Sequence, residues 1–176
     1  MAGPLSSRPL GILAEQTRVM QIQNPRPLGP LSESSLAEFE QAYGLQLPPE
    51  YRAFLLEFNG GVPSPSFFWI VEPTDGSSVN QFYGLHAGPQ PLSIHTYAGI
   101  ERYGIPSHML PIGDDGVGNS ICVVARGRMP GEIHFLDHEV HPYDDPESTI
   151  GITRLASSFG EFLASLRVSP EEERDA

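Results

Sequence analysis

The chain has 176 residues and a formal net charge of −12. Its length suits one domain with a real core, and its 39% hydrophobic and 18% charged residues exclude a disordered composition. Binding to nucleic acid or to an anionic membrane needs many basic side chains, and this chain has ten, all arginine. A basic protein is the kind of partner that such a charge attracts.

The compartment can be inferred from what the sequence lacks. No apolar run approaches the roughly 18 residues of a membrane span. The first residues show no basic region followed by a long apolar stretch, so we expect no signal peptide. The single cysteine, Cys122, excludes an internal disulfide and lies in the apolar segment SICVV, where a thiol behaves as a small hydrophobe. We therefore expect a cytoplasmic protein.

Residues 1–30 are predicted to be an N-terminal helix and a linker. In PLGILAEQTRVMQIQ, Leu10, Leu13 and Met20 fall on one face of a short helix. The segment NPRPLGP follows, and its three prolines and glycine make Asn24–Pro30 a linker. We expect the main domain to occupy residues 31–168.

The segment SESSLAEFEQAYG predicts the first helix of that domain. Ser35 and Glu38 match a capping box, and Ser32 is an alternative cap for an earlier start. Gly44 is placed to end the helix in the left-handed conformation, with Leu45 packing back on the last turn.

The segment LPPEYRAFLLEFNGG predicts a second helix over residues 49–58. Proline suits its first turn, and Asn59 and the two glycines tolerate the positive φ that ends it. We expect the two helices to pack together against a sheet through aromatic side chains, namely Phe39, Tyr43, Phe54 and Phe58.

Shorter, β-branched and aromatic segments follow the two helices. SFFWIVE and SVNQFYGL are predicted to pair as strands with TDGSS as their turn. PLSIHTYAGIERYG predicts a third helix, and LPIG, SICVVARG and GEIHFLDHE predict strands. HPYDDPEST is an acidic loop, ASSFGEFLASLRV is a last helix with Ser158 and Glu161 as a capping box, and residues 169–176 are an acidic, solvated tail. This order of elements predicts an α+β fold with a mostly antiparallel sheet flanked by helices.

The stretch LPIGDDGVGNSICV contains the densest cluster of glycines and acids. A dinucleotide loop needs G-x-G-x-x-G opening a helix, whereas here a strand follows. A phosphate-binding Walker loop needs a lysine, and a calcium loop needs alternating acids over 12 residues, which the adjacent Asp114 and Asp115 do not supply. We expect Gly113–Asn119 to be a turn between two strands, with Gly and Asn at positive φ, binding no metal or nucleotide.

The segment HFLDHEVH is the next candidate for chemistry. His134, His138 and His141 lie near one another in sequence, with Asp137 and Glu139 between them. The spacing is one residue short of H-E-x-x-H, so exposed strand and loop residues are favoured over a zinc site. A metal-dependent enzyme using His134, His138 and Asp137 remains an alternative.

Nucleophiles and paired acids give little support for catalysis. The chain has no G-x-S-x-G elbow, and Asp144 and Asp145 lie in a proline-containing loop with nothing to indicate a glycosidase cleft. We therefore expect no enzymatic activity, no cofactor and no metal.

Several segments together resemble the SUKH superfamily, which includes the fungal Smi/Knr cell-wall regulators. They are LPPEYRAFLLEFNGGVPSP, SSVNQFYGL, IPSHMLPIGDDGVGNSICV, GEIHFLDHE and SFGEFLASL, in that order, over roughly Leu31 to Leu166. Val117 departs from the family pattern, in which a small residue or glycine is common.

The resemblance implies an α+β fold without enzymatic activity. Most bacterial members are similar to immunity proteins, which bind and neutralise a toxin domain, often a nuclease or deaminase, of polymorphic or contact-dependent toxin systems. The fungal members are regulators with long disordered flanks, which this sequence lacks, so we expect the bacterial type. A regulator or scaffold with a cellular partner that is not a toxin is the alternative.

Such a toxin must be basic to hold nucleic acid, so an acidic surface suits it. Phe67, Phe68 and Trp69 are candidate aromatic anchors, with core packing expected for at least two of them. The residues expected near the partner are Asp114, Asp115, Asn119, Asp137, Glu139, Asp144, Asp145 and Trp69.

Overall fold

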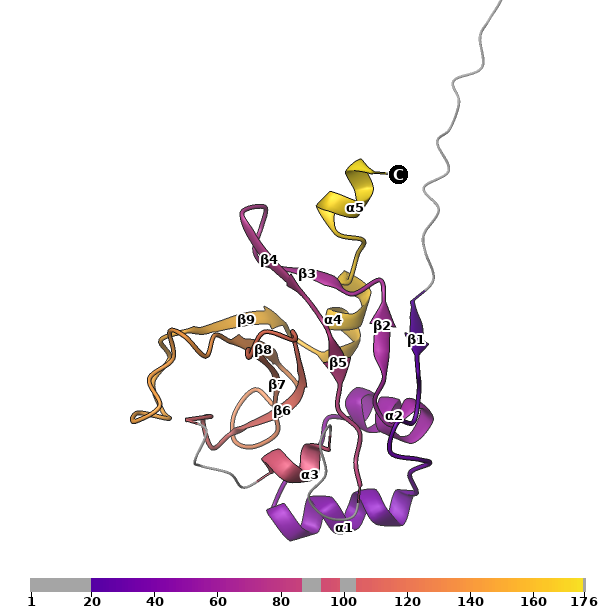
Figure 1. The fold of residues 1–176 in the computed structure, drawn as a ribbon. Helices are drawn as coiled ribbons and strands as arrows, with labels where there is room; N and C mark the ends of the chain where they lie inside the picture. The colour runs from indigo at the N-terminus through magenta and orange to yellow at the C-terminus, as the bar shows by residue number, and fades with distance from the viewer. Residues whose placement is uncertain (1–19, 87–92, 99–103, 176) are drawn as a thin grey trace, which may run out of the picture.

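A five-stranded antiparallel sheet forms the centre of the computed structural model, which describes residues 20–86, 93–98 and 104–175. Helices α2 and α4 lie together on one side of this sheet, and the long loop after β8 leaves on the other (Figure 1). The predicted α+β class is confirmed. In sheet order the strands are β5 (Gln81–Phe82), β6 (Met109–Asp114), β7 (Ser120–Val124), β8 (Ile133–Leu136) and β9 (Ile152–Ala156).

The two faces of the sheet bury different sets of side chains because neighbouring residues of a strand point to opposite faces. One face carries the main core, to which β6, β7 and β8 contribute Leu110, Ile112, Ile121, Val123, Ile133 and Phe135. The other carries a smaller apolar cluster of Met109, Cys122, Val124 and Leu136. Cys122 is fully buried, as expected for a small hydrophobe, and burial raises the pKa of its thiol to about 12.

Strand β1 (Gln21–Gln23) corrects the predicted N-terminal helix. It pairs antiparallel with β2 (Val62–Ser64), which follows the glycines after α2. Met20 and Ile22 pack on the main core, and this spacing of two suits a strand, because residues two apart share a face of a strand but not of a helix. The rest of the predicted helix lies outside the described residues.

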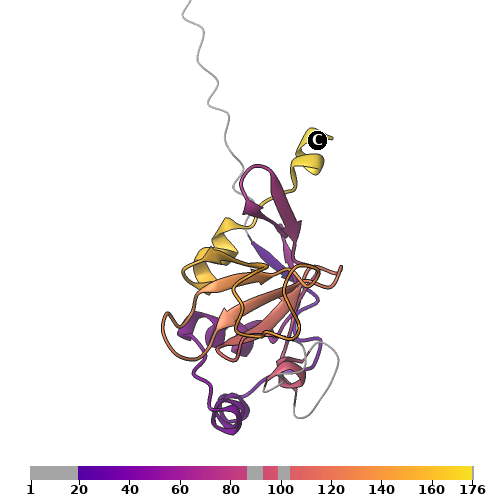
Figure 2. The ribbon, with the colours of Figure 1, turned by 90° about the vertical axis from the view of Figure 1, so that its left-hand side faces the viewer.

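The second small sheet differs from the predicted hairpin. β3 (Phe67–Val71) pairs with β4 (Asp75–Ser78), so most of the expected turn TDGSS is itself a strand. The turn comes earlier, where the backbone N–H and the hydroxyl of Thr74 both donate to the Val71 carbonyl. Figure 2 shows this hairpin projecting above the large sheet, next to the C-terminal helix.

Helix α1 (Glu33–Tyr43) starts at the earlier of the two predicted caps. The Ser32 hydroxyl accepts a hydrogen bond from the Ser35 backbone N–H at 3.1 Å, and Gly44 ends the helix at a φ of 59°. Helix α2 (Pro49–Phe58) ends as predicted at Asn59, whose φ is 43°.

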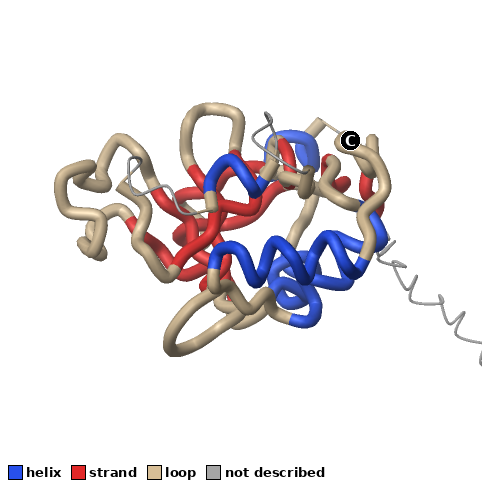
Figure 3. Tube along the Cα trace, turned by 90° about the horizontal axis from the view of Figure 1, so that it is seen from below, coloured by secondary structure: helices blue, strands red, loops and turns tan. Residues whose placement is uncertain are grey.

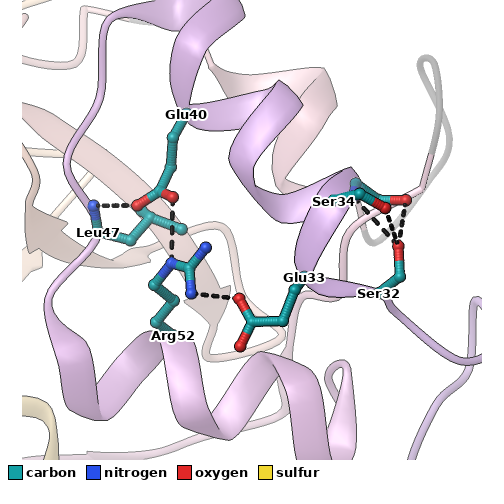
Figure 4. Close-up of polar contacts among 7 residues, drawn as sticks. Ser32, Glu33, Ser34, Glu40, Leu47 and Arg52 are labelled. Atoms are coloured by element: carbon teal, nitrogen blue, oxygen red, sulfur yellow. Dashed lines mark hydrogen bonds and ion pairs between the residues drawn. The ribbon is translucent and has the colours of Figure 1, made fainter.

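Arg52 ties α2 to α1, the long helix that Figure 3 shows lengthwise from below. Its guanidinium lies 2.5 Å from a Glu33 carboxylate oxygen and 3.1 Å from one of Glu40 (Figure 4). The other Glu40 oxygen accepts from the Leu47 backbone N–H at 2.9 Å. One arginine therefore fixes the angle between the helices and the start of the second.

The aromatic side chains of these helices lie in the core as expected, but with other partners. Phe39 and Tyr43 pack against His95 of α3 (Ile94–Tyr97). Phe54 instead packs on Phe82 and Phe159, each edge-on. The expectation that rings would join α1 to α2 is therefore corrected, since α1 packs toward α3 and α2 packs toward α4.

Replacing Arg52 with alanine should lower the free energy of unfolding by about 1–2 kcal/mol, because Glu40 then stays partly buried without its cation. Urea denaturation measures this loss. Arg128 is exposed, so Arg128→Ala is the matched control and should change stability by less than about 0.5 kcal/mol. Equal losses in the two variants would contradict the assigned role of the ion pairs.

The C-terminal third contains elements that the sequence did not reveal. Strand β9 was missed, and the acidic tail is exposed as expected but contains helix α5 (Pro170–Arg174). Helix α4 (Phe159–Ser165) is capped by the Ser158 hydroxyl, although Glu161 contacts Ser157 rather than closing the predicted box. Within the described residues, no helix is long and apolar enough to cross a membrane.

Candidate functional site

The β6–β7 hairpin is the turn between two strands that the sequence predicts. Gly113 and Asp114 complete β6, and residues 115–119 form the loop. Gly116 and Gly118 have φ angles of 81° and 110°, where a side chain would strain the backbone. Asn119 was expected to add a third positive φ, but it contributes its side chain instead.

Asp115 holds the loop in shape. One carboxylate oxygen accepts from the backbone N–H groups of Val117 at 3.0 Å and Asn119 at 3.1 Å. The other accepts from the Asn119 amide at 2.7 Å and from the Ser77 hydroxyl at 3.2 Å. Asp115 is therefore a structural residue of the hairpin.

Asn119 connects the hairpin to the end of β8. Its side-chain oxygen accepts from the His138 backbone N–H at 3.1 Å and from His138 Nδ1 at 2.8 Å. Gly118 lies against the same imidazole, since an added Cβ would come within 2.8 Å of the ring. The loop after β8 is thus held beside the hairpin.

Asp114 points to a different neighbourhood from Asp115. Its carboxylate accepts from the Asn80 amide and from the Gly116 backbone N–H, both at 2.9 Å. Burial raises the pKa of the Tyr83 hydroxyl, and the nearby Asp114 carboxylate raises it further. The side chains of the two adjacent acids therefore make their hydrogen bonds on opposite sides of one loop.

A hollow of about 360 Å³ lies on the Asp115 side of the hairpin. We call it the valine hollow, because Val71, Val117 and Val140 line it and are 54%, 72% and 54% exposed. Exposed apolar side chains gathered in one place are typical of protein-binding surfaces. Three acidic residues line the same hollow, namely Asp75, Asp115 and Asp137.

A second cavity of about 450 Å³ lies on the Asp114 side. We call it the tyrosine pocket, because Tyr83, Tyr97 and Tyr143 line it together with Asp114 and His138. Asn119 borders both cavities, so the hairpin separates them.

The loop from Asp137 to Gly151 carries the remaining predicted acids. Asp137 accepts from the Glu139 backbone N–H at 2.9 Å and shapes the start of the loop. Glu139, Asp144 and Asp145 are exposed, which leaves their charge available to a partner.

Two side chains fasten this loop to the body of the protein. The Glu147 carboxylate accepts from the Ser107 backbone N–H at 3.2 Å and from its hydroxyl at 3.1 Å, and these bonds lower the Glu147 pKa. Buried His141 places its ring nitrogens 2.8 Å from the Ile150 carbonyl oxygen and 2.5 Å from that of Gly104. The acidic surface is therefore part of a fixed loop.

The three candidate aromatic anchors divide differently from expectation. Only Phe68 is in the core, 2% exposed and packed on Phe135 and Phe162. Phe67 and Trp69 are half-buried and pack edge-on against each other, with ring centroids 4.8 Å apart. Trp69 is not among the described residues that line either cavity.

The histidines that suggested zinc have separate partners. His134 lies 3.2 Å from a Glu132 carboxylate oxygen, while His138 bonds Asn119. No group of three His, Cys, Asp or Glu side chains suited to a metal occurs among the residues that the structure describes.

Sequence reasoning missed the tyrosines and two of the valines. Tyr83, Tyr97 and Tyr143 come from three distant segments, so only the fold brings them together. Val71 is the last residue of the apolar strand β3, and Val140 lies in the loop after β8, which ends at Leu136. The position of each valine at or beyond a strand end is the signal that could have indicated exposure.

Comparisons with known proteins fit this geometry. The model of the SMI1/KNR4 family (SUKH-1) matches residues 30–165, which include α1, α2, the whole large sheet and α4. The SPbeta prophage-derived uncharacterized protein YokK of Bacillus subtilis (strain 168) is 30% identical over 161 residues, covering 80% of this chain and 77% of that protein. The chain therefore belongs to the SMI1/KNR4 family, SUKH-1.

Proposed function

We propose that this protein is a non-enzymatic binding protein of the immunity type, which binds and neutralises a basic toxin domain. The observation that carries the proposal is the valine hollow, where three exposed valines lie among three acids at one rigid hairpin. Family membership supports the same class of function.

Charge and apolar area have separate roles at this surface. The net charge of −12 and the exposed acids of the 137–151 loop attract a basic domain from solution. Once the partner is in place, burial of the valines supplies the short-range attraction, at about 25 cal/mol per Å² of apolar surface. A toxin that acts on nucleic acid needs basic residues at its own active site, so the same acidic surface would cover that site.

Such an encounter takes place in the cytoplasm, where a toxin reaches its nucleic-acid target. The reduced, buried Cys122 suits that compartment. The partner is expected to be a toxin domain of a large, multidomain secreted protein encoded next to this gene.

Growth rescue tests the proposal. Cells expressing the neighbouring toxin domain should survive when this protein is co-expressed. Val117→Asp should weaken the rescue, because it replaces the most exposed valine of the hollow with a charged side chain that is costly to bury against the partner. Met129→Asp is the matched control, since Met129 is 62% exposed, lines neither cavity and already has a positive φ of 62° that aspartate tolerates.

Equal rescue by wild type and both variants would place the contact elsewhere on the protein. Failure of the wild type to rescue, together with failure to bind any neighbouring toxin, would favour the regulator or scaffold function.

A further inference from the structure

The tyrosine pocket lies on the face of the sheet opposite the main core. Asp114 and Ser120 are paired across β6 and β7, and Ser120 is paired with Leu136 of β8. These three residues line the pocket from one row of the sheet, with the tyrosines and His138 around them. Its volume of about 450 Å³ falls within the range of about 300–1,000 Å³ typical of ligand pockets.

The acidic group of this pocket is held as a hydrogen-bond acceptor. The Asp114 carboxylate accepts hydrogen bonds from the Asn80 amide and the Gly116 backbone N–H, and it also hydrogen-bonds the Tyr83 side chain. These donors hold the carboxylate in one orientation, and an ionised carboxylate accepts hydrogen bonds without donating any. Asp114 is thus a fixed negative charge at the wall of the pocket.

A relay of side chains sets the chemistry of His138. The Asn119 amide donates to Asp115, which leaves the Asn119 oxygen as the acceptor for His138 Nδ1. Nδ1 therefore carries a proton, and in the neutral imidazole Nε2 is then an acceptor. His138 Nε2 is then a second acceptor in the pocket, besides Asp114, for a hydrogen bond from an N–H group of a ligand.

Aromatic rings supply the rest of the lining. Tyr83 and Tyr97 are stacked, with ring centroids 4.9 Å apart and planes 11° from parallel. Tyr143 lies at the mouth and is 63% exposed. A cation over the face of a tyrosine is attracted by the ring, and a guanidinium also stacks flat on it.

We propose that the tyrosine pocket binds the guanidinium of an arginine side chain from the partner. A carboxylate, an imidazole acceptor and tyrosine rings together match a flat cation with several N–H donors, whereas an anion would be repelled by the carboxylate and a neutral group would gain no attraction between opposite charges. This inference rests on the proposed function, because the arginine would come from the basic partner protein proposed there. The pocket and the valine hollow flank one hairpin, so one partner can engage both.

The test uses a small probe and needs no toxin. Two-dimensional NMR follows a titration of the full chain with N-acetyl-arginine methylamide and, separately, with the neutral isostere N-acetyl-citrulline methylamide. We expect the arginine probe to shift the signals of Gly116, Gly118 and His138 with a dissociation constant of about 1–10 mM, as suits a single side chain. The citrulline probe should bind at least tenfold more weakly.

Variants locate the site. Asp114→Asn keeps an oxygen for Asn80 and Gly116 but removes the charge, and should weaken the arginine probe at least tenfold. Tyr143→Leu removes an exposed ring without touching the hairpin and should weaken it several-fold. Asp144→Asn removes an equal charge from the exposed loop and should leave it unchanged.

One further variant removes an arginine of the chain itself that is close in sequence to the lining residues. Arg102 lies in the sequence between the lining residues Tyr97 and Ile105, so the titration is repeated on Arg102→Gln. Equal binding of the two probes, or no binding of the arginine probe to either wild type or Arg102→Gln, would overturn the proposal. That result would leave toxin neutralisation intact, because growth rescue is measured separately.

Discussion

Replacing Asp115 with alanine is expected to lower the free energy of unfolding by about 2–3 kcal/mol. Its carboxylate accepts hydrogen bonds from Val117, Asn119 and Ser77, and the Asn119 amide that it positions in turn holds His138. Alanine would leave these donors without an acceptor in a partly buried loop. Urea denaturation followed by circular dichroism measures the change.

Asp144→Ala is the control for Asp115→Ala, because Asp144 is exposed and lies on the neighbouring loop. It should change stability by less than about 0.5 kcal/mol, the usual range for surface substitutions. Similar stability of the two variants would show that the hydrogen bonds of Asp115 do not hold the hairpin.

The second large effect is on association rate. Neutralising three exposed acids together, as Glu139→Gln, Asp144→Asn and Asp145→Asn, should slow association with the basic partner about tenfold at low salt. The wild-type rate should also fall as salt rises, because the Debye length shrinks to about 8 Å at physiological ionic strength. Stability should change little, since isolated exposed charges contribute less than about 1 kcal/mol each. Stopped-flow fluorescence at several salt concentrations measures the rates.

A matched control changes the net charge equally at another place. Glu171→Gln, Glu173→Gln and Asp175→Asn also remove three exposed acids, but from α5 and its end. This variant should associate with the partner at nearly the wild-type rate. An equal slowing in both triple variants would show that total charge matters and the position of the 137–151 loop does not.

Local sequence patterns predicted the elements that end or turn at residues able to adopt a positive φ. The end of α1 at Gly44, the end of α2 at Asn59 and the glycine-rich hairpin each follow from residues that tolerate positive φ. These features depend on a few neighbouring residues, so the sequence is enough to place them.

Elements set by distant partners were harder to predict. β1 forms because β2 offers a strand to pair with, and β4 forms inside a segment that looks like a turn. β9 is half-exposed at the sheet edge, and Arg154 within it bonds Glu132, so it lacks a clear apolar alternation. The pairing that defines these strands is absent from their own sequence.

The candidate site shows the same division. Charge and glycine content drew attention to the hairpin, but they did not separate the two adjacent acids. The structure assigns Asp115 to the loop and the valine hollow, and Asp114 to the tyrosine pocket. That difference depends on Asn80, Ser77 and His138, which reach the hairpin from other segments of the chain.

The central claim is that a basic partner binds at the β6–β7 hairpin and the loop beside it. Hydrogen–deuterium exchange of this protein, alone and with the neighbouring toxin domain, tests that claim most directly. We predict slower exchange in the complex over residues 115–119 and 137–151, with α1 and α5 unchanged. Protection confined to α1 and α2, with unchanged exchange at the hairpin, would contradict it.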